Sequence, residues 1–373
     1  MLRLLVLLVF HITGALAQSP EVTFENSNFT LSAPVDATKD TIVYNYNRLR
    51  VTTSLNQDNW FFTSIGDIEN YLGSEMIESS SYIANRQIQS DTPFATQTST
   101  NNYGGGEYSA KLYRLYGGYV DASHRVSFGV QKISMGVGRI WNPTDLFNPK
   151  NPLALESDQV YGTFSLLYTY ALSDLSQVTA IVAQREDHSF KYASRIKGYI
   201  KVVDIALNIV SADDATMIGY ELEGELFESG IALRSEGGWF EDKLLNKEFF
   251  QATFGADYTF ENSLSLIGEW LYSSKNFDSQ ILSLSSLGLA NNLMQSKGYG
   301  GLSIGYEFDA LLYGTITSIT SADDGSFYVA PSLRYSLADD VTLLTGVMFF
   351  DGKERSEFAN IDPTCYINFK VTF

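Results

Sequence analysis

The stretch Cys365-Tyr366-Ile367-Asn368-Phe369-Lys370-Val371-Thr372-Phe373 decides the fold. Counted back from Phe373, every second residue is apolar or aromatic as far as Cys365, and the residues between them are polar or amphipathic. A period of two places the two sets on opposite faces of a β-strand. The segment therefore predicts an amphipathic strand, and an ordinary edge strand of a soluble sheet is the alternative on this segment alone.

The same strand resembles the assembly signal of bacterial outer-membrane β-barrels, whose last strand ends on phenylalanine. The positions that carry the resemblance are Ile367, Phe369, Val371 and Phe373. The resemblance implies outer-membrane lipid as the surroundings of the protein. It also implies the barrel assembly machinery and periplasmic chaperones as partners.

The beginning of the chain predicts an export signal. A short basic start is followed by an apolar run from Leu4 to Ile12, which is too short to span a bilayer comfortably. Ala15-Leu16-Ala17 then supplies the small-x-small pattern that signal peptidase reads. We therefore expect residues 1–17 to be a cleaved signal peptide. Residues 18–373 are expected to form a single barrel domain in the cell outer membrane.

Composition separates a membrane barrel from a soluble periplasmic protein. Aromatic residues make up 14% of the chain, with 23 Tyr and 24 Phe, and hydrophobic residues make up 45%. No stretch after the signal approaches the roughly 18 apolar residues of a spanning helix. Only helices and closed barrels satisfy their backbone within lipid, and abundant Tyr and Phe suit the aromatic girdles of a barrel. The only cysteine is Cys365, so no intramolecular disulfide forms.

Strands with alternating residues recur along the chain. Ala252-Phe254-Ala256-Tyr258-Phe260, for example, alternates with polar or small residues. The stretch from Phe250 to Phe260 covers about 25 Å of membrane height at ~3.3 Å per residue and a tilt near 40°. Soluble strands are usually only about five or six residues long. The lengths therefore favour an apolar-out, polar-in barrel with a wet interior.

The connections between these strands alternate in length. Short turns such as Asp121-Ala122-Ser123 and Glu261-Asn262-Ser263 alternate with mostly longer segments such as 138–157 and 276–296. Outer-membrane barrels place short turns in the periplasm and longer loops outside. From Tyr108 to the C-terminus this alternation gives about fifteen strands.

The first hundred residues complete the count. Residues 40–54 and 60–67 predict a hairpin, and Val22 to Leu31 is a weaker strand candidate that makes the number even. We predict an all-β fold, a transmembrane antiparallel up-and-down β-barrel of about 18 strands, with about 16 as the alternative. Residues 69–106, rich in Ser, Thr, Asn and Gln, are expected to form one long outer loop.

The charges predict how the lumen is lined. The chain has 43 acidic and 25 basic residues, a net charge of −18. Charges on the lipid face near the midplane cost a few kcal/mol each, so ladders of charge along a strand should face the lumen. The pore-lining candidates chosen in this way are Arg195, Lys197, Lys201, Glu221, Glu223, Glu225, Asp257 and Arg334. Facing rows of opposite charge set a transverse field and an acidic excess favours cations. The alternative is that the two ladders pair with each other.

The segment 129–152 is the most distinctive part of the chain. Pro143, Pro149 and Pro152 cannot donate to a ladder, so the strand is expected to stop near Arg139. A stiff loop of about twenty residues follows, the right size to fold inward and narrow a pore, although an outward rim loop is equally consistent with the sequence. The candidate constriction residues are Arg139, Trp141, Asn142, Asp145, Phe147 and Asn148.

This segment, with its N-P-x-D-L-F-N-P loop, resembles porin-like outer-membrane barrels of a largely uncharacterised family. The resemblance runs from about Tyr108 to the C-terminus and implies a barrel and a channel, not a particular substrate. The chain departs from the family pattern at Val130, where the pattern has Arg, and at Met135, where it has Trp. Trimers are common among porins, and the sequence leaves open whether this chain forms a homotrimer.

The sequence gives no sign of an enzyme. The mature chain has only His124 and His188, and neither zinc-ligand spacing nor a phosphate-binding glycine loop is present. We therefore expect no catalytic residues, no cofactor, no metal and no nucleic-acid partner. The favoured hypothesis is a channel for passive diffusion of small hydrophilic solutes that prefers cations. The alternative is a plugged or closed barrel that acts as a surface receptor, adhesin or structural protein.

Overall fold

A computed structural model describes residues 19–34, 41–79, 82–83, 90–278, 295–359 and 361–373. The expected signal peptide, residues 1–17, lies outside the described residues. Among the residues that are described, no helix is both long enough and apolar enough to cross a membrane.

The described residues form one antiparallel sheet of nineteen strands and one short helix. The elements are β1 (Glu21–Pro34), β2 (Thr41–Gln57), β3 (Trp60–Leu72), α2 (Ser74–Glu78), β4 (Asn101–Tyr103), β5 (Gly106–Val120), β6 (His124–Gln131), β7 (Thr163–Ser173), β8 (Ser176–Gln184), β9 (Phe190–Ile200), β10 (Val203–Ser211), β11 (Ala215–Glu225), β12 (Ala232–Asp242), β13 (Lys247–Thr259), β14 (Leu264–Ser273), β15 (Gly298–Glu307), β16 (Leu312–Ser321), β17 (Phe327–Ala338), β18 (Val341–Asp351) and β19 (Thr364–Thr372).

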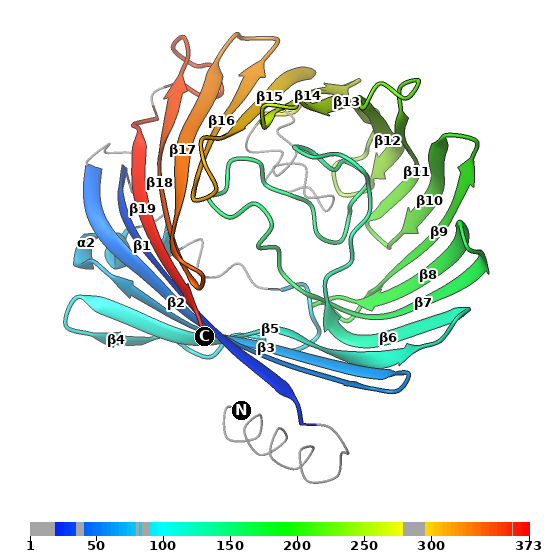
Figure 1. The fold of residues 1–373 in the computed structure, drawn as a ribbon, viewed down its shortest axis with the longest axis horizontal. Helices are drawn as coiled ribbons and strands as arrows, with labels where there is room; N and C mark the ends of the chain where they lie inside the picture. Colours follow the sequence, from blue (N-terminus) through cyan, green and yellow to red (C-terminus); the bar gives the residue numbers. More distant parts are fainter. Residues whose placement is uncertain (1–18, 35–40, 80–81, 84–89, 279–294, 360) are drawn as a thin grey trace.

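The sheet closes on itself as a barrel (Figure 1). Strand β1 pairs with β2 on one edge and with the C-terminal strand β19 on the other. The short strand β4 pairs only with the beginning of β5 and adds nothing to the circumference. The result is the predicted transmembrane antiparallel barrel with 18 strands in its wall, because the weak candidate around residues 22–31 is β1. The alternative of 16 strands is wrong.

The two ends of the barrel differ as predicted. At one end the strands are joined by short turns, of which 58–59, 174–175, 201–202 and 339–340 have only two residues, and the C-terminus lies at this end. At the other end lie residues 132–162 and the described parts of the connections 73–105, 274–297 and 352–363. We call these the short-turn end and the long-loop end.

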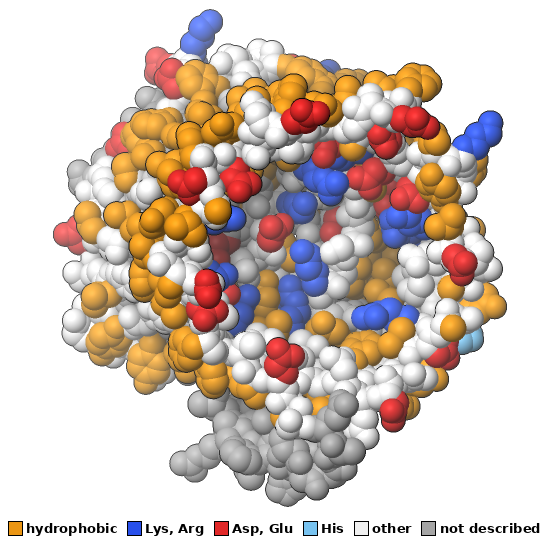
Figure 2. Space-filling model, viewed as in Figure 1, with side chains coloured by type: hydrophobic (Ala, Val, Ile, Leu, Met, Phe, Trp, Pro, Cys, Tyr) orange, Lys and Arg blue, Asp and Glu red, His pale blue; other side chains and the backbone are white. Residues whose placement is uncertain are grey.

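The two faces of the wall differ in chemistry because side chains alternate along each strand. Large apolar side chains stand exposed on the outer face; examples are Ile196, Leu207, Ile218, Trp239, Phe254 and Trp270. The neighbouring positions on the inner face are largely polar or charged. Figure 2 shows charged side chains of both signs in the hollow of the barrel, further ones on its rim, and hydrophobic side chains around it.

Three sequence predictions need correction. Strand β6 ends at Gln131 rather than near Arg139, because Ile133 and Met135 turn into an apolar cluster inside the barrel. Glu69 is not in a loop, since β3 continues to Leu72 and turns its polar side chains to the lumen. Lys201 lies in the turn after β9 with a φ of 58°, so it is not part of the strand ladder.

Candidate functional site

Residues 132–162, here called the inner loop, leave the wall between β6 and β7 and fold into the lumen (Figure 1). Trp141 and Thr144 in this loop are completely buried although they lie outside any strand. Both residues form backbone hydrogen bonds to carboxylates of the wall, and Trp141 also packs on apolar wall residues. The loop therefore narrows the interior of the barrel.

Two carboxylates of the wall hold the first half of the inner loop. Glu236 on β12 accepts hydrogen bonds from the backbone N–H groups of Val137, Gly138 (2.9 Å) and Thr144 (3.2 Å). Glu269 on β14 accepts from three consecutive N–H groups, those of residues 139, 140 and 141, at 2.5, 2.8 and 3.2 Å. Five successive loop amides thus point at two wall carboxylates. Hydrogen bonds to an ionised acceptor are stronger than neutral ones, so these are the main anchors of the loop.

Apolar contacts flank the two anchors. On one side, Ile133, Met135 and Leu146 of the loop pack in a cluster with inner-face residues of β11 to β13; these are Met217, Phe240 and Phe249. On the other side, Trp141 packs with Leu271 and Tyr299. The wall makes room for the indole with a glycine, because a Cβ on Gly301 would lie 2.7 Å from the Trp141 ring.

The N-P-x-D-L-F-N-P motif shapes the loop itself. Asp145 accepts hydrogen bonds from the backbone N–H groups of Met135, Phe147 and Asn148. The Asn148 amide accepts from the N–H of Ile133 at 2.7 Å and donates to the carbonyl of residue 161. Polar side chains that satisfy backbone groups in this way fix a buried loop that has no ladder of its own. Asp145 and Asn148 therefore hold the conformation of the loop rather than face the pore.

Ion pairs to the opposite wall hold the second half of the loop. Glu156 accepts two hydrogen bonds from the guanidinium of Arg48 on β2, at 2.7 and 2.8 Å. Gln159 accepts from Arg50, whose guanidinium also pairs with Asp67 on β3 at 2.7 Å. The inner loop thus spans the lumen from the wall at β11 to β15 to the wall at β2 and β3.

Most of the predicted pore-lining side chains lie on the inner face of β9 to β13, where many of them pair. Arg195 pairs with Glu221, and Lys197 pairs with Asp204 at 3.3 Å. Arg334 is also on the inner face, opposite Leu344 of β18, and no ion pair is recorded for it among the described residues. One ion pair, Arg195 with Glu221, joins the two predicted ladders, whereas Lys197 and Glu223 pair with residues outside them.

An arginine that the sequence did not single out lies at the centre of this wall. The side chain of Arg234 on β12 has no exposed surface and pairs with Asp257 on β13. Its guanidinium lies 3.7 Å from Glu269 and 3.9 Å from Glu223. Glu223 in turn accepts from Arg139 of the inner loop at 3.2 Å. This group joins the wall to the anchored loop.

The residues that anchor the loop were missed because each looks ordinary in its strand. Adjacent apolar pairs were a usable signal: Met217-Ile218, Trp239-Phe240 and Phe249-Phe250 break the alternation near the long-loop ends of their strands. A barrel wall with apolar residues on both faces needs something apolar inside it. No comparable signal marks Glu236 or Glu269. Among the described residues, no group of acidic, His or Cys side chains is arranged to hold a metal ion.

The segment 352–359 at the long-loop end packs on the Trp141 cluster through Phe358 and carries a titratable group. Phe358 packs in that cluster, and Glu357 beside it accepts a hydrogen bond from the Tyr299 hydroxyl at 2.6 Å. Burial raises the pKa of Glu357 to about 7. Burial acts against ionisation of Asp324 as well, but hydrogen bonds from Ser326 and the Glu357 N–H hold its pKa at about 2.

This arrangement predicts a loop that docks less firmly as pH rises. Between the two pKa values, the docked loop keeps a proton on Glu357 that the undocked loop releases. The contribution of Glu357 to docking is therefore complete below about pH 4.5 and lost above about pH 7. The measurement is the rate of trypsin cleavage after the exposed Lys353 and Arg355, divided by the rate for a Glu357→Gln variant at the same pH. We expect this ratio to be higher at pH 8 than at pH 6. The same ratio at both pH values would contradict the prediction.

Comparison with known proteins finds the fold and little else. No family model and no curated protein matches the chain. Among solved structures, Acinetobacter baumannii OccAB4 aligns over 95% of this chain and 98% of its own, with a TM-score of 0.58 and 11% identity. Pseudomonas aeruginosa OpdK with vanillate aligns over 95% of this chain and 98% of its own, with a TM-score of 0.60 and 9% identity. Pseudomonas aeruginosa OccK5 (OpdH) aligns over 95% of this chain and 98% of its own, with a TM-score of 0.58 and 12% identity. These likenesses establish the barrel architecture over nearly the whole chain.

Proposed function

We propose that this protein is a porin-like channel of the bacterial outer membrane, through which small hydrophilic solutes diffuse passively. The observation that carries the proposal is a wide closed barrel whose lumen is lined by charge and narrowed by a loop anchored on both walls. A barrel of about 16–18 strands is wide enough for an aqueous channel, whereas ~8 strands would be filled by side chains.

The shared fold supports the same proposal. One structure with this architecture, OpdK, was solved with vanillate, which favours small organic solutes as ligands of such barrels. The apolar outer face supports a membrane location. We further propose that residues 1–17 direct export and that the strand ending in Ile367, Phe369, Val371 and Phe373 is read by the barrel assembly machinery.

We also propose a preference for cations. Along the inner face of β9 to β14, acidic side chains outnumber basic ones, even though several of them are paired. Glu223 and Asp257 keep part of their surface exposed, at 29% and 28% of the side chain. An excess of carboxylates in a confined lumen raises the local concentration of cations.

The test of the proposal is the reversal potential of the purified, refolded protein in a planar bilayer under a salt gradient. Discrete open steps with cation preference are expected. Glu223→Gln should reduce that preference, while Glu228→Gln, which changes a carboxylate in the turn between β11 and β12, should leave it unchanged. Anion preference would keep the channel and remove the proposed role of Glu223. A folded barrel that never conducts would favour a plugged surface protein.

A further inference from the structure

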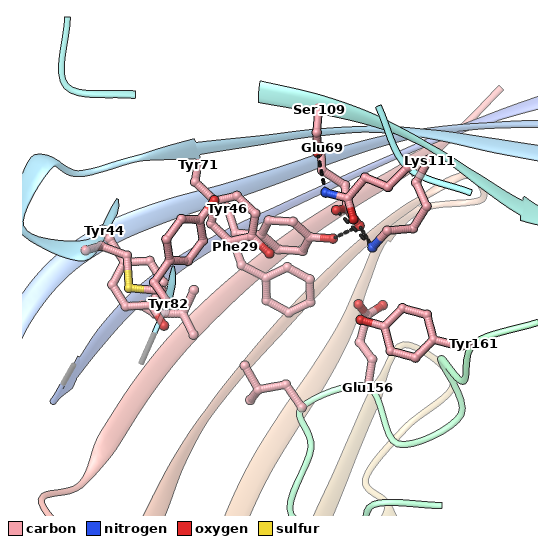
Figure 3. Close-up of a pocket in the computed structure, with 14 residues that line it drawn as sticks. Phe29, Tyr44, Tyr46, Glu69, Tyr71, Tyr82, Ser109, Lys111, Glu156 and Tyr161 are labelled. Carbon is pink, nitrogen blue, oxygen red and sulfur yellow. Dashed lines mark hydrogen bonds and ion pairs between the residues drawn. The ribbon is translucent and has the colours of Figure 1, made fainter. Parts of the chain in front are cut away.

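A cavity of about 310 Å³ lies beside the inner loop at the long-loop end of the lumen (Figure 3). Strands β1, β2, β3 and β5 form its wall, and it is closed by Met76, Tyr82 and Gln97 and by Leu155, Glu156 and Tyr161 of the inner loop. Binding sites for small molecules typically have volumes of about 300–1,000 Å³, so the cavity suits one small solute. Tyr161, one of the lining residues, is 37% exposed.

One end of the cavity is apolar and aromatic. The rings of Phe29, Tyr46, Tyr71 and Tyr82 follow one another with centroid distances of 6.0, 4.6 and 4.9 Å. They come from three neighbouring strands and from the segment 73–105, so they form a continuous wall (Figure 3). Leu155 of the inner loop adds an aliphatic surface. This end would take an apolar ring and no charge.

The other end carries charges of both signs. The ammonium group of Lys111 lies 3.2 and 3.1 Å from the two carboxylate oxygens of Glu69. Glu156 faces the same space and is paired with Arg48, which approaches it from the wall. An ammonium has three donors and a carboxylate about four acceptor positions, so both pairs can bind a further partner. The side chain of Glu156 is 27% exposed, and that of Lys111 is 14% exposed.

We propose that this cavity binds a small zwitterion that carries an aromatic or bulky apolar group, such as an aromatic amino acid. The inference rests on the proposed channel function, because the solute reaches the cavity through the lumen. The carboxylate of the solute binds Lys111, its ammonium group binds Glu156, and its ring packs on the wall formed by Phe29 and Tyr46.

The charge balance of the site favours a zwitterion over a simple ion. An aromatic anion would meet Lys111 but also the carboxylates of Glu69 and Glu156. An aromatic cation would meet those carboxylates but also the ammonium of Lys111. A zwitterion satisfies both, and the aromatic wall then adds specificity for the rest of the molecule. A charge-assisted hydrogen bond contributes about 1.5–3 kcal/mol, which corresponds to roughly 10–100-fold in affinity.

The test is calorimetric titration of the folded full chain in detergent with L-phenylalanine, 3-phenylpropionate, phenethylamine and glycine. L-phenylalanine should bind about tenfold or more tightly than the two aromatic ions, each of which lacks one charged group, and than glycine, which lacks the ring. Lys111→Met should weaken binding of L-phenylalanine and improve that of phenethylamine. Glu156→Gln should instead improve binding of 3-phenylpropionate. Lys197→Met, on the far wall, is the matched control and should change nothing.

The change of preference makes the test independent of any loss of stability in the variants. Equal affinity for 3-phenylpropionate and L-phenylalanine would overturn the zwitterion site in favour of an anion site. Conduction without binding of any of the four compounds would overturn the inference and leave the channel proposal standing. Binding with the expected preferences in a barrel that never conducts would support the site and overturn the channel.

Discussion

Replacement of both Glu236 and Glu269 by glutamine is expected to raise the single-channel conductance and to make the open current unsteady. These two carboxylates accept the N–H groups of residues 137–141, which form the part of the inner loop that lies against the wall of β12 and β14. Without them the loop loses its polar anchors and can move away from that wall. The lumen beside that wall then widens.

The size of the effect follows from the chemistry of the acceptors. Glutamine keeps one oxygen but turns an NH₂ group toward N–H donors, so in its best orientation it still loses the contacts of the Arg139 and Thr144 N–H groups, and the contacts that remain lose their charge. The loss of charge-assisted hydrogen bonds costs about 1.5–3 kcal/mol each, and ~3 kcal/mol already shifts the ratio of free to anchored loop by more than about 100-fold. The apolar contacts of Trp141 with Tyr299 and Leu271 remain, so the loop should sample both states instead of unfolding.

Asp204→Asn is the matched control, because it also removes a carboxylate from the inner wall, and among the described residues Asp204 pairs with Lys197 and not with the inner loop. It should leave the conductance close to that of the unchanged protein. If the Glu236/Glu269 double variant conducted like Asp204→Asn, with equally steady current, the inner loop would not owe its position to these carboxylates.

The barrel could be predicted from sequence because its signals are local. Alternation within strands and the contrast between turn and loop lengths depend only on neighbouring residues, and they led to the correct strand number. Even β1, the weakest candidate, was recovered through the rule that strand counts are even. The register of the closure, with Phe24 and Phe373 bonded to each other through their backbones, was not predicted, because alternation fixes the face of a residue but not its partner.

The interior could not be predicted because its contacts join residues far apart in the chain. Glu236 contacts an amide at residue 137, and Arg48 contacts Glu156. Nothing near either residue in the sequence distinguishes a carboxylate that pairs with a neighbouring strand from one that anchors a loop. The glycine-rich and proline-rich composition of 129–152 showed that the strand must end, but it could not show on which side of the wall the chain continues.

Arg234→Met is expected to give the largest loss of stability of any single substitution in the wall. The side chain of Arg234 is completely buried between Asp257, Glu269 and Glu223. Methionine fills a similar volume but leaves three carboxylates without their shared cation. Removal of one partner of a buried ion pair costs about 3–5 kcal/mol, and the partial exposure of Glu223 and Asp257 places the expected loss near ~3 kcal/mol. The measurement is the urea concentration that unfolds the protein in detergent.

Two further variants separate the charge of Arg234 from its packing. Arg234→Lys keeps the cation and should recover part of the lost stability, whereas Arg334→Met, on the inner face of β17 with no recorded ion pair, should be nearly neutral. Among the described residues, Arg234 forms its hydrogen bond and ion pairs with wall residues and none with the inner loop, so its loss should lower stability more than it changes conductance. The Glu236/Glu269 double variant should instead change conductance more than it lowers stability. Identical stability of Arg234→Met and Arg334→Met would mean that the three carboxylates are solvated well enough to need no shared cation.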